Sequence, residues 1–389
     1  MRILTTLYYY RPHYSGLTVY TERLARRLVA RGHQVTILTS RYDPSLPRLE
    51  RLDGLAIHRL TVGLKLSKGV IMPSMPYWAT RLAASHDIVH LHVPQLDAAP
   101  MALTARLLGK PAVLTYHCDL RLPASPVNWL ANHASRLADR ISAAAANIVV
   151  TNTRDYAESS PLLRRFLHKL VVIPPPVEVE PVEQALVAEM RARLDVRPGQ
   201  RLIGMAARLA TEKGAEVLAL AMSRVLERFP AARVLYVGQY QDVLGEEEYG
   251  RRLQPLLQSL GDHWKFLGVL PLDEMAAFYR LCEVTVLPSL NSTESFGMVQ
   301  VESMLCGTPV VARDLPGVRE PTAVTGMGLV VPPAEPAALA AGIIRILDQP
   351  EAYRGNPRAA ARYEPEHVAE AYETLFQSLL IGRALGEKE

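Results

Sequence analysis

The chain has 389 residues, 49% of them hydrophobic and 21% charged. This length and balance predict two packed domains and exclude wholesale disorder. The net charge of +4 conceals an asymmetry, because residues 1–176 carry +12 and residues 177–389 carry −8. A basic first half is expected to meet an anionic partner (a nucleic acid, an acidic lipid surface or a phosphorylated substrate) or simply to be solvated.

Strand-like and helix-like segments alternate along the first half of the chain. An apolar strand at 2–8 is followed by a helical pattern at 17–31, and further strands are expected at 34–40, 87–92, 111–117 and 147–151. Helical patterns fall at 96–108 and 126–144. Such alternation is typical of parallel strands joined by crossover helices. Residues 1–176 are therefore predicted to form one α/β domain.

The alternation restarts after a proline-rich stretch, PPPVEVEP at 174–181, which we take as the domain boundary. The predicted second domain covers residues 177–365, with strands at 201–207, 232–238, 264–268, 283–289 and 309–313 and helices at 213–229, 246–260, 272–281 and 297–305. A last helical pattern at 366–381 can pack on either domain, and we assign residues 366–389 to a helix that packs back on the first. Two tandem, Rossmann-like, doubly wound domains facing a cleft are the natural architecture.

The cysteines and the apolar runs of the sequence exclude several other classes of protein. The three cysteines are odd in number and far apart, so neither a disulfide framework nor a zinc cluster is expected. No apolar run approaches about 18 residues, and the first residues lack the pattern of a signal peptide. We expect a cytoplasmic protein, with peripheral attachment to the inner face of the membrane left open.

The most informative stretch, at 283–320, contains Glu294 and, eight residues later, Glu302. A strand runs into a loop that ends at Glu294, and a helix is expected to begin near Phe296–Gly297. Its first amides, from Phe296 through Gly297 and Met298 to Val299, can bind an anion or a hydroxyl group. The two carboxylates can address different parts of one elongated ligand, or Glu294 can be a favourable charge near a helix start and Glu302 an exposed helix residue.

Two cations, Arg208 and Lys213, follow the carboxyl end of another predicted strand. They can hold a diphosphate there, although Arg and Lys at this spacing are also common on solvated faces. In the first domain His117 ends a strand, where it can donate to a substrate hydroxyl or be a buried structural histidine. His90 and His92 are interpreted as structural. The motifs GxGxxG, GxxxxGK[ST], GxSxG and HExxH are absent, which disfavours dinucleotide binding, P-loop hydrolysis, serine-hydrolase and zincin chemistry.

Taken together, these residues resemble the retaining glycosyltransferases of the GT-B fold, in family 4 (glycosyl transferases group 1). The resemblance covers nearly the whole chain. Its most specific element is the E-x7-E motif, here Glu294 to Glu302 in ESFGMVQVE, and Arg208 with Lys213 matches the R-x4-K element. YHCD around His117, YVG ending at Gly238 and KFLG at 265–268 also fit.

The resemblance implies a sugar-nucleotide site in the second domain. Arg208 and Lys213 would neutralise the diphosphate without a metal or other cofactor, and the amides from Phe296 to Val299, with Gly238, would contact the donor. Glu302 would hold the ribose, Glu294 the sugar hydroxyls, and His117 the transferred sugar. Gly16 would lie near the donor phosphate, although Ser15-Gly16 departs from the two adjacent glycines of many relatives, which leaves the conformation of that loop open.

The implied reaction is transfer of a hexosyl group, with retention, from a UDP-sugar or GDP-mannose to a glycan, lipid-linked or small-molecule acceptor. The basic first half would be the acceptor side, and residues 64–82 with the arginines of 17–31 could rest on an anionic membrane, unless their apolar residues belong to the core. Low aromatic content (6%) argues against a nucleic-acid partner. The alternatives are a sugar-nucleotide epimerase or a phosphorylase of the same fold, and a non-catalytic protein that binds a nucleotide or an acidic polymer.

Overall fold

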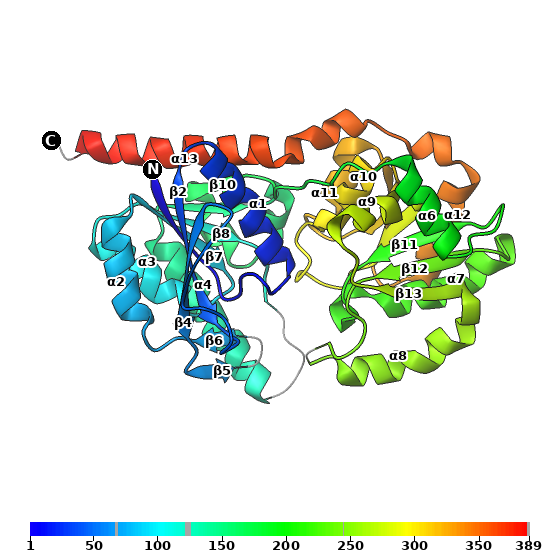
Figure 1. The fold of residues 1–389 in the computed structure, drawn as a ribbon, viewed down its shortest axis with the longest axis horizontal. Helices are drawn as coiled ribbons and strands as arrows, with labels where there is room; N and C mark the ends of the chain where they lie inside the picture. Colours follow the sequence, from blue (N-terminus) through cyan, green and yellow to red (C-terminus); the bar gives the residue numbers. More distant parts are fainter. Residues whose placement is uncertain (67–68, 121–125, 244, 387–389) are drawn as a thin grey trace. The chain divides into compact units, whose positions relative to one another are not determined.

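The computed structural model describes residues 1–66, 69–120, 126–243 and 245–386. The chain divides into two compact units (Figure 1). Unit 1 comprises Met1–Pro176 together with Tyr363–Glu389, and unit 2 comprises Val177–Arg362. The proline-rich stretch 174–181 contains the point of division and forms no helix or strand.

Unit 1 is built on an eight-stranded sheet with the order β10-β9-β8-β7-β1-β2-β4-β3. All neighbouring strands are parallel except β3 and β4, which form an antiparallel hairpin. Central strand β7 is buried along its whole length, as expected for a parallel strand covered on both faces. The strands are β1 (Arg2–Thr6), β2 (Gln34–Arg41), β3 (Leu49–Leu52), β4 (Leu55–Thr61), β7 (Ile88–Val93), β8 (Ala112–Tyr116), β9 (Ile148–Thr151) and β10 (Leu170–Val172), with a separate hairpin of β5 (Leu64–Leu66) and β6 (Gly69–Ile71).

Helices cover both faces of this sheet. On one face α2 (Met75–Ser85), α3 (Ala98–Leu107) and α4 (Pro126–Ala145) pack on residues such as Leu91 and Leu114. On the other, α13 (Pro365–Gly386) reaches Thr115 of β8 through a hydrogen bond and packs along α1 (Gly16–Ala30). The short helix α5 (Arg154–Ser159) follows β9.

Unit 2 contains a six-stranded, wholly parallel sheet with the order β13-β12-β11-β14-β15-β16. Its strands are β11 (Leu202–Ala206), β12 (Arg233–Val237), β13 (Trp264–Gly268), β14 (Val284–Leu287), β15 (Val310–Arg313) and β16 (Gly328–Val331). Its helices are α6 (Gln184–Arg193), α7 (Ala215–Arg228), α8 (Glu247–Leu260), α9 (Leu272–Leu281), α10 (Met298–Leu305), α11 (Arg319–Thr325) and α12 (Pro336–Asp348).

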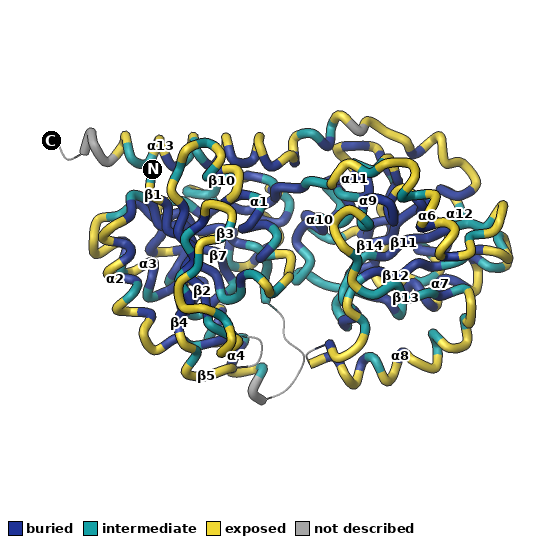
Figure 2. Tube along the Cα trace, in the orientation of Figure 1, coloured by how far each residue is buried: buried dark blue, intermediate teal, exposed yellow. Residues whose placement is uncertain are grey.

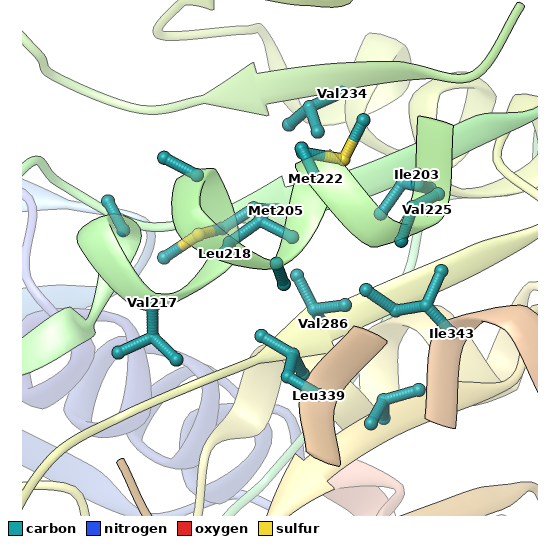
Figure 3. Packing of buried hydrophobic residues seen from close by; sticks show 14 of the residues in the cluster. Ile203, Met205, Val217, Leu218, Met222, Val225, Val234, Val286, Leu339 and Ile343 are labelled. Carbon is teal, nitrogen blue, oxygen red and sulfur yellow. The ribbon is translucent and has the colours of Figure 1, made fainter. Parts of the chain in front are cut away.

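The core of unit 2 shows how an aliphatic sequence pattern becomes a packed layer (Figure 3). Met222 of α7 lies beside Val234 of β12, and Val286 of β14 lies beside Leu339 and Ile343 of α12. All five side chains are at most 3% exposed. This packing holds the strands in place, so the loops that follow their carboxyl ends start from a rigid sheet edge.

Candidate functional site

Three loops meet at the carboxyl edge of the unit 2 sheet, after β11, β12 and β14. Main-chain hydrogen bonds join them: the Leu290 amide donates to the Glu212 carbonyl (2.9 Å), and the Leu209 amide donates to the Gln239 carbonyl (2.7 Å). Because these bonds link loops rather than strands, they hold the side chains of all three loops in a fixed arrangement.

Two glycines allow this close approach of the loops. Gly238 has φ +127°, and a Cβ atom there would lie 2.1 Å from the Ala207 carbonyl oxygen. Gly214 has φ +73°, and its Cβ would lie 2.1 Å from the Pro288 carbonyl oxygen. Either contact is far inside van der Waals distance, so only glycine fits at these positions.

The loops bring Lys213 and Glu294 together across 81 residues of sequence. Lys213 ends a 3₁₀ turn, Thr211–Lys213, and its Nζ lies 2.6 Å from Glu294 Oε2. The Ser289 hydroxyl donates to the same oxygen at 3.4 Å. The side chains are 24% and 14% exposed, so the pair is half-buried yet open to a ligand.

Arg208 lies on the same edge, but sequence reasoning missed its partner. Its guanidinium donates to the carboxylate of Glu212, four residues along the chain. The expectation that both cations stand ready for an anion is therefore incomplete, since each already pairs with a carboxylate. Lys213 and Arg208 have three and five N–H donors, so each keeps donors for a further anion. The spacing of four residues between Arg208 and Glu212 is the sequence feature that could have revealed this ion pair.

Glu302 is held by a tyrosine from the neighbouring helix. Its Oε2 accepts a hydrogen bond from the Tyr279 hydroxyl of α9 at 2.9 Å, and Tyr279 is 1% exposed. Helix α10 begins at Met298, one residue later than predicted, after Gly297 at φ +77°. The interpretation of Glu302 as a merely exposed helix residue is thus wrong, and Tyr279 is a supporting residue that sequence spacing did not reveal.

In unit 1, His117 follows the last residue of β8 and pairs with another histidine. His92 Nδ1 and His117 Nε2 are 2.8 Å apart, and the edge of Tyr20 lies against the His117 ring at 4.8 Å between centroids. Burial lowers the pKa of His117 to about 3, so its ring is neutral at physiological pH and can donate through only one nitrogen. The interpretation of His92 as structural missed its contact with this candidate residue.

Gly16 is the first residue of α1, one residue earlier than the predicted helix start. The helix is capped by Ser15, whose hydroxyl oxygen accepts from the Thr18 amide at 3.2 Å. Serine is a favourable N-cap, so Ser15 has a structural reason to precede Gly16.

A pocket of about 200 Å³ lies in unit 1 where α1 begins and where β1 and β7 end. Its wall includes Tyr8, Tyr9 and Leu17, and its polar lining includes Gln95 and Ser135. Three buried oxygens near it have no hydrogen-bond partner among the described residues: Gln95 Oε1 in the lining, and Asp97 Oδ2 and Asp139 Oδ1 of two residues that do not line the pocket. A ligand or water that donates to Gln95 Oε1 would complement the lining.

Asp139 lies behind the lining of this pocket. The Ser135 hydroxyl donates to its Oδ2 at 3.4 Å, and the main-chain N–H of Gln95 donates to the same carboxyl group. Burial raises the pKa of Asp139 to about 8 and that of Asp97 to about 6. Sequence reasoning singled out neither residue, because a lone aspartate in a helical pattern carries no sign of burial.

Within the four described ranges, no three His, Cys, Asp or Glu side chains are grouped as ligands for a metal ion.

Comparison with known proteins defines the class of the chain. The model "Glycosyl transferases group 1" matches residues 187–363, and the model "Glycosyl transferase 4-like domain" matches residues 15–176. The chain is similar to a 2-deoxystreptamine N-acetyl-D-glucosaminyltransferase of Streptomyces fradiae, at 30% identity over 95% of this chain and 92% of the relative. It is also similar to a D-inositol 3-phosphate glycosyltransferase of Acidothermus cellulolyticus, at 29% identity over 95% and 86% of the two chains.

The fold has solved counterparts. HepE of Anabaena, crystallised with UDP-glucose, superposes with a TM-score of 0.78 at 20% identity, over 97% of this chain and 100% of the other. This two-domain α/β architecture is that of the GT-B glycosyltransferases. The protein belongs to the glycosyl transferases group 1 family of that fold and is a glycosyltransferase, as the sequence motifs predicted.

Proposed function

We propose that the protein transfers a hexosyl group, with retention of anomeric configuration, from a UDP-sugar or GDP-mannose to a hydroxyl group of an acceptor. The observation that carries this proposal is the half-buried Lys213–Glu294 pair, at 2.6 Å, on the same loop edge as Arg208. A cation and a hydroxyl-binding carboxylate in contact suit a ligand that has a phosphate beside a sugar.

The proposed roles of the residues follow from where charge develops during the reaction. Cleavage of the bond between the sugar and the diphosphate places negative charge on the leaving group and positive character on the sugar. Arg208 and Lys213 would stabilise the diphosphate, on the scale of about 3–4 kcal/mol for one preorganised donor in other enzymes. Glu294, held by Lys213, would accept hydrogen bonds from the sugar hydroxyls. The proposal requires no metal.

The remaining donor contacts are proposed from the family resemblance. Glu302, oriented by Tyr279, would bind the ribose hydroxyls, and the first amides of α10 would contact the donor. His117 would hydrogen-bond the transferred sugar, and Gly16 would lie near the phosphate. Retention through a front-face mechanism, with the departing phosphate as base, is implied by the same resemblance.

The pocket of unit 1 is our candidate for the acceptor. The unpaired Gln95 Oε1 of its lining favours a molecule with hydroxyl or amino donors, such as a glycan, the sugar end of a lipid-linked acceptor or an aminocyclitol. The relative from Streptomyces fradiae is named for such an aminocyclitol, 2-deoxystreptamine. A bulky substitution at the rim, Leu17→Trp, should abolish transfer while donor hydrolysis and nucleotide binding persist. Loss of donor hydrolysis and nucleotide binding together with transfer would contradict the assignment of this pocket to the acceptor.

A thermal-shift panel of UDP, GDP and ADP tests the donor site. A nucleotide at 100 times its Kd should stabilise the protein by about 2.7 kcal/mol. We expect UDP or GDP to raise the melting temperature of the native chain and of Arg354→Ala, an exposed control in unit 2 whose guanidinium pairs with Glu351. Lys213→Met should lose the shift, and an undiminished shift in this variant would refute the proposed diphosphate contact.

Product analysis separates transfer from the alternatives. A transferase releases nucleoside diphosphate faster when the acceptor is present, whereas an epimerase changes the sugar and leaves the nucleotide attached. A non-catalytic protein would bind nucleotide and do neither.

A further inference from the structure

Helices α3 and α4 of unit 1 expose leucine and tryptophan side chains to solvent and bury mainly alanines and serines. Against the sheet, α3 buries Met101 and four alanines, while Leu103 is 45% and Leu107 87% exposed. The buried positions of α4 are alanine, serine and Asp139, whereas Trp129, Leu130 and Leu137 are 63%, 56% and 60% exposed. A helix that merely covers a sheet shows the opposite pattern.

These side chains extend over adjacent helices. Helix α3 packs against α2 on one side and α4 on the other, and α2 adds Tyr77, which is 59% exposed. Figure 2 shows exposed positions along the outer sides of α2 and α3. We call this surface the outer helical face, defined by Tyr77, Leu103, Leu107, Trp129, Leu130 and Leu137. Grouped exposed apolar residues of this kind mark an interaction surface.

The charge of the outer helical face is of one sign. Helices α2, α3 and α4 contain a single carboxylate, Asp139, which is 2% exposed. Four arginines are exposed on the same helices: Arg81, Arg106, Arg136 and Arg140. No ion pair involves any of the four within the described part of the chain.

A basic pocket of about 600 Å³ adjoins this face, at the ends of α3 and α4. Arg106, Lys110 and Lys169 line it, together with Ser378 and Leu379 of α13. Lys169 donates to the carbonyls of Ala144 (3.2 Å) and Ala146 (2.7 Å), which fixes its ammonium group in the wall. The pocket therefore concentrates positive charge beside exposed apolar side chains.

We propose that the outer helical face docks on an anionic membrane surface, with its aromatic and leucine side chains at the boundary of headgroups and acyl chains and its arginines on lipid phosphates. A second copy of the chain is a poorer occupant, because a twofold interface through this face would oppose its own unpaired arginines. No helix in the described residues combines the length and apolarity needed to span a bilayer. This inference goes beyond the proposed function and does not depend on it.

The surface differs from the one that the sequence predicted within 64–82 and 17–31. Met72 and Met75 are buried in the core of unit 1, so only part of 64–82 faces outward. Arg31 of α1 is bound by Glu366 and Glu373 of α13, which removes a cation from the other predicted patch.

Flotation of the full chain with vesicles tests the proposal. Vesicles of equal parts phosphatidylglycerol and phosphatidylcholine should bind the protein, whereas phosphatidylcholine alone should not, and added salt should weaken binding. Arg106→Ala and Arg136→Ala should each lower affinity by about fivefold, the equivalent of about 1 kcal/mol per cation at an anionic surface. Trp129→Ser and Leu107→Ser should also weaken binding, and Trp129→Ser should lose part of any blue shift of tryptophan emission.

Leu220→Ser, at a 45% exposed leucine of unit 2, is the matched control and should bind like the native chain. All these positions are exposed, so the variants should fold, which a thermal melt would verify. Absence of binding to phosphatidylglycerol vesicles, or equal binding by the outer-face variants and the control, would overturn the proposal. A native dimer that these variants convert to monomer would overturn it too, because the face would then be an interface between copies.

Discussion

At the scale of single residues, the proposed donor site contains two ion pairs, and we expect their removal to have different effects. The carboxylate of Glu294 pairs with Lys213 and is proposed to serve the ligand, whereas Glu212 occupies Arg208 and would compete with a diphosphate. Removing the Glu294 carboxylate should therefore slow the reaction, whereas removing the Glu212 carboxylate should strengthen nucleotide binding.

Glu212→Gln should tighten the binding of UDP or GDP by roughly two- to fivefold, because Arg208 loses a competing anion worth at most about 1 kcal/mol at a partly exposed site. Glu294→Gln should leave nucleoside diphosphate affinity within about threefold and lower kcat by roughly 100-fold or more, if the carboxylate acts on the sugar. Titration calorimetry and donor-hydrolysis rates measure the two effects. Weaker nucleotide binding by Glu212→Gln would contradict the assignment of Arg208.

Asp139 gives a prediction on stability and pH. Its pKa is raised by burial to about 8, well above the ordinary value of 3.8, so the folded protein retains a proton that the unfolded chain has lost. The stability associated with this group is therefore fullest below about pH 4 and declines as pH rises toward about 8. Asp139→Asn removes the titration, and its melting temperature should rise relative to that of the native chain between about pH 5 and pH 8. A difference that is constant with pH would show that the carboxyl group titrates normally.

At the scale of secondary-structure elements, the C-terminal helix is tied to the sheet of unit 1 by a buried chain of hydroxyl groups. The Tyr372 hydroxyl of α13 lies 2.7 Å from that of Tyr20 on α1 and 2.8 Å from that of Thr115 on β8. Thr115 in turn bonds His90 Nε2 at 2.8 Å. A helix from the end of the sequence thus completes the polar core of the first unit.

Tyr372→Phe should lower the free energy of unfolding by roughly 1–3 kcal/mol, because it leaves two buried hydroxyl groups with fewer partners. Equilibrium denaturation followed by circular dichroism measures this loss. The matched control is Tyr14→Phe, which removes a hydroxyl from a side chain that is 57% exposed and should change stability little. Equal effects of the two substitutions would rule out a stabilising role for the hydroxyl chain.

Most strands could be predicted from sequence because central parallel strands are continuous apolar runs. The predicted strand at 264–268 and helix at 272–281 agree with β13 and α9 at both ends. The hairpin of β3 and β4 was missed, although Asp53-Gly54, both at positive φ, carries the usual turn signal. Helices α2, α6 and α12 were not predicted either. Of these, α2 contributes Tyr77 to the outer helical face.

The residues of the candidate site could be chosen from sequence where they belong to a motif, and not where they depend on packing. Arg208, Lys213, Glu294 and Glu302 could be chosen from spacing after strands. Glu212, Tyr279, His92 and Asp139 could not, because their importance lies in a partner or in burial that the fold alone supplies.

At the scale of the whole molecule, we propose a sugar-nucleotide site in unit 2, and in unit 1 an acceptor pocket and a basic, apolar helical face that meets a membrane. Residues 363–389, which belong to unit 1, carry −4, so the net charge is +8 for unit 1 and −4 for unit 2. A basic unit 1 would meet the anionic surface that we propose, and in the acidic unit 2 the proposed diphosphate-binding cations, Arg208 and Lys213, lie at one loop edge.

The central claim is retaining transfer from a nucleoside diphosphate sugar, and the configuration of the first sugar released tests it without knowledge of the acceptor. Proton NMR can follow slow hydrolysis of UDP-glucose and GDP-mannose, whose sugars are α-linked, before the product mutarotates. With retention, the α-anomer should appear first, and Lys213→Met and Glu294→Gln should suppress its release. Initial release of the β-anomer, or hydrolysis unaffected by either substitution, would contradict the claim.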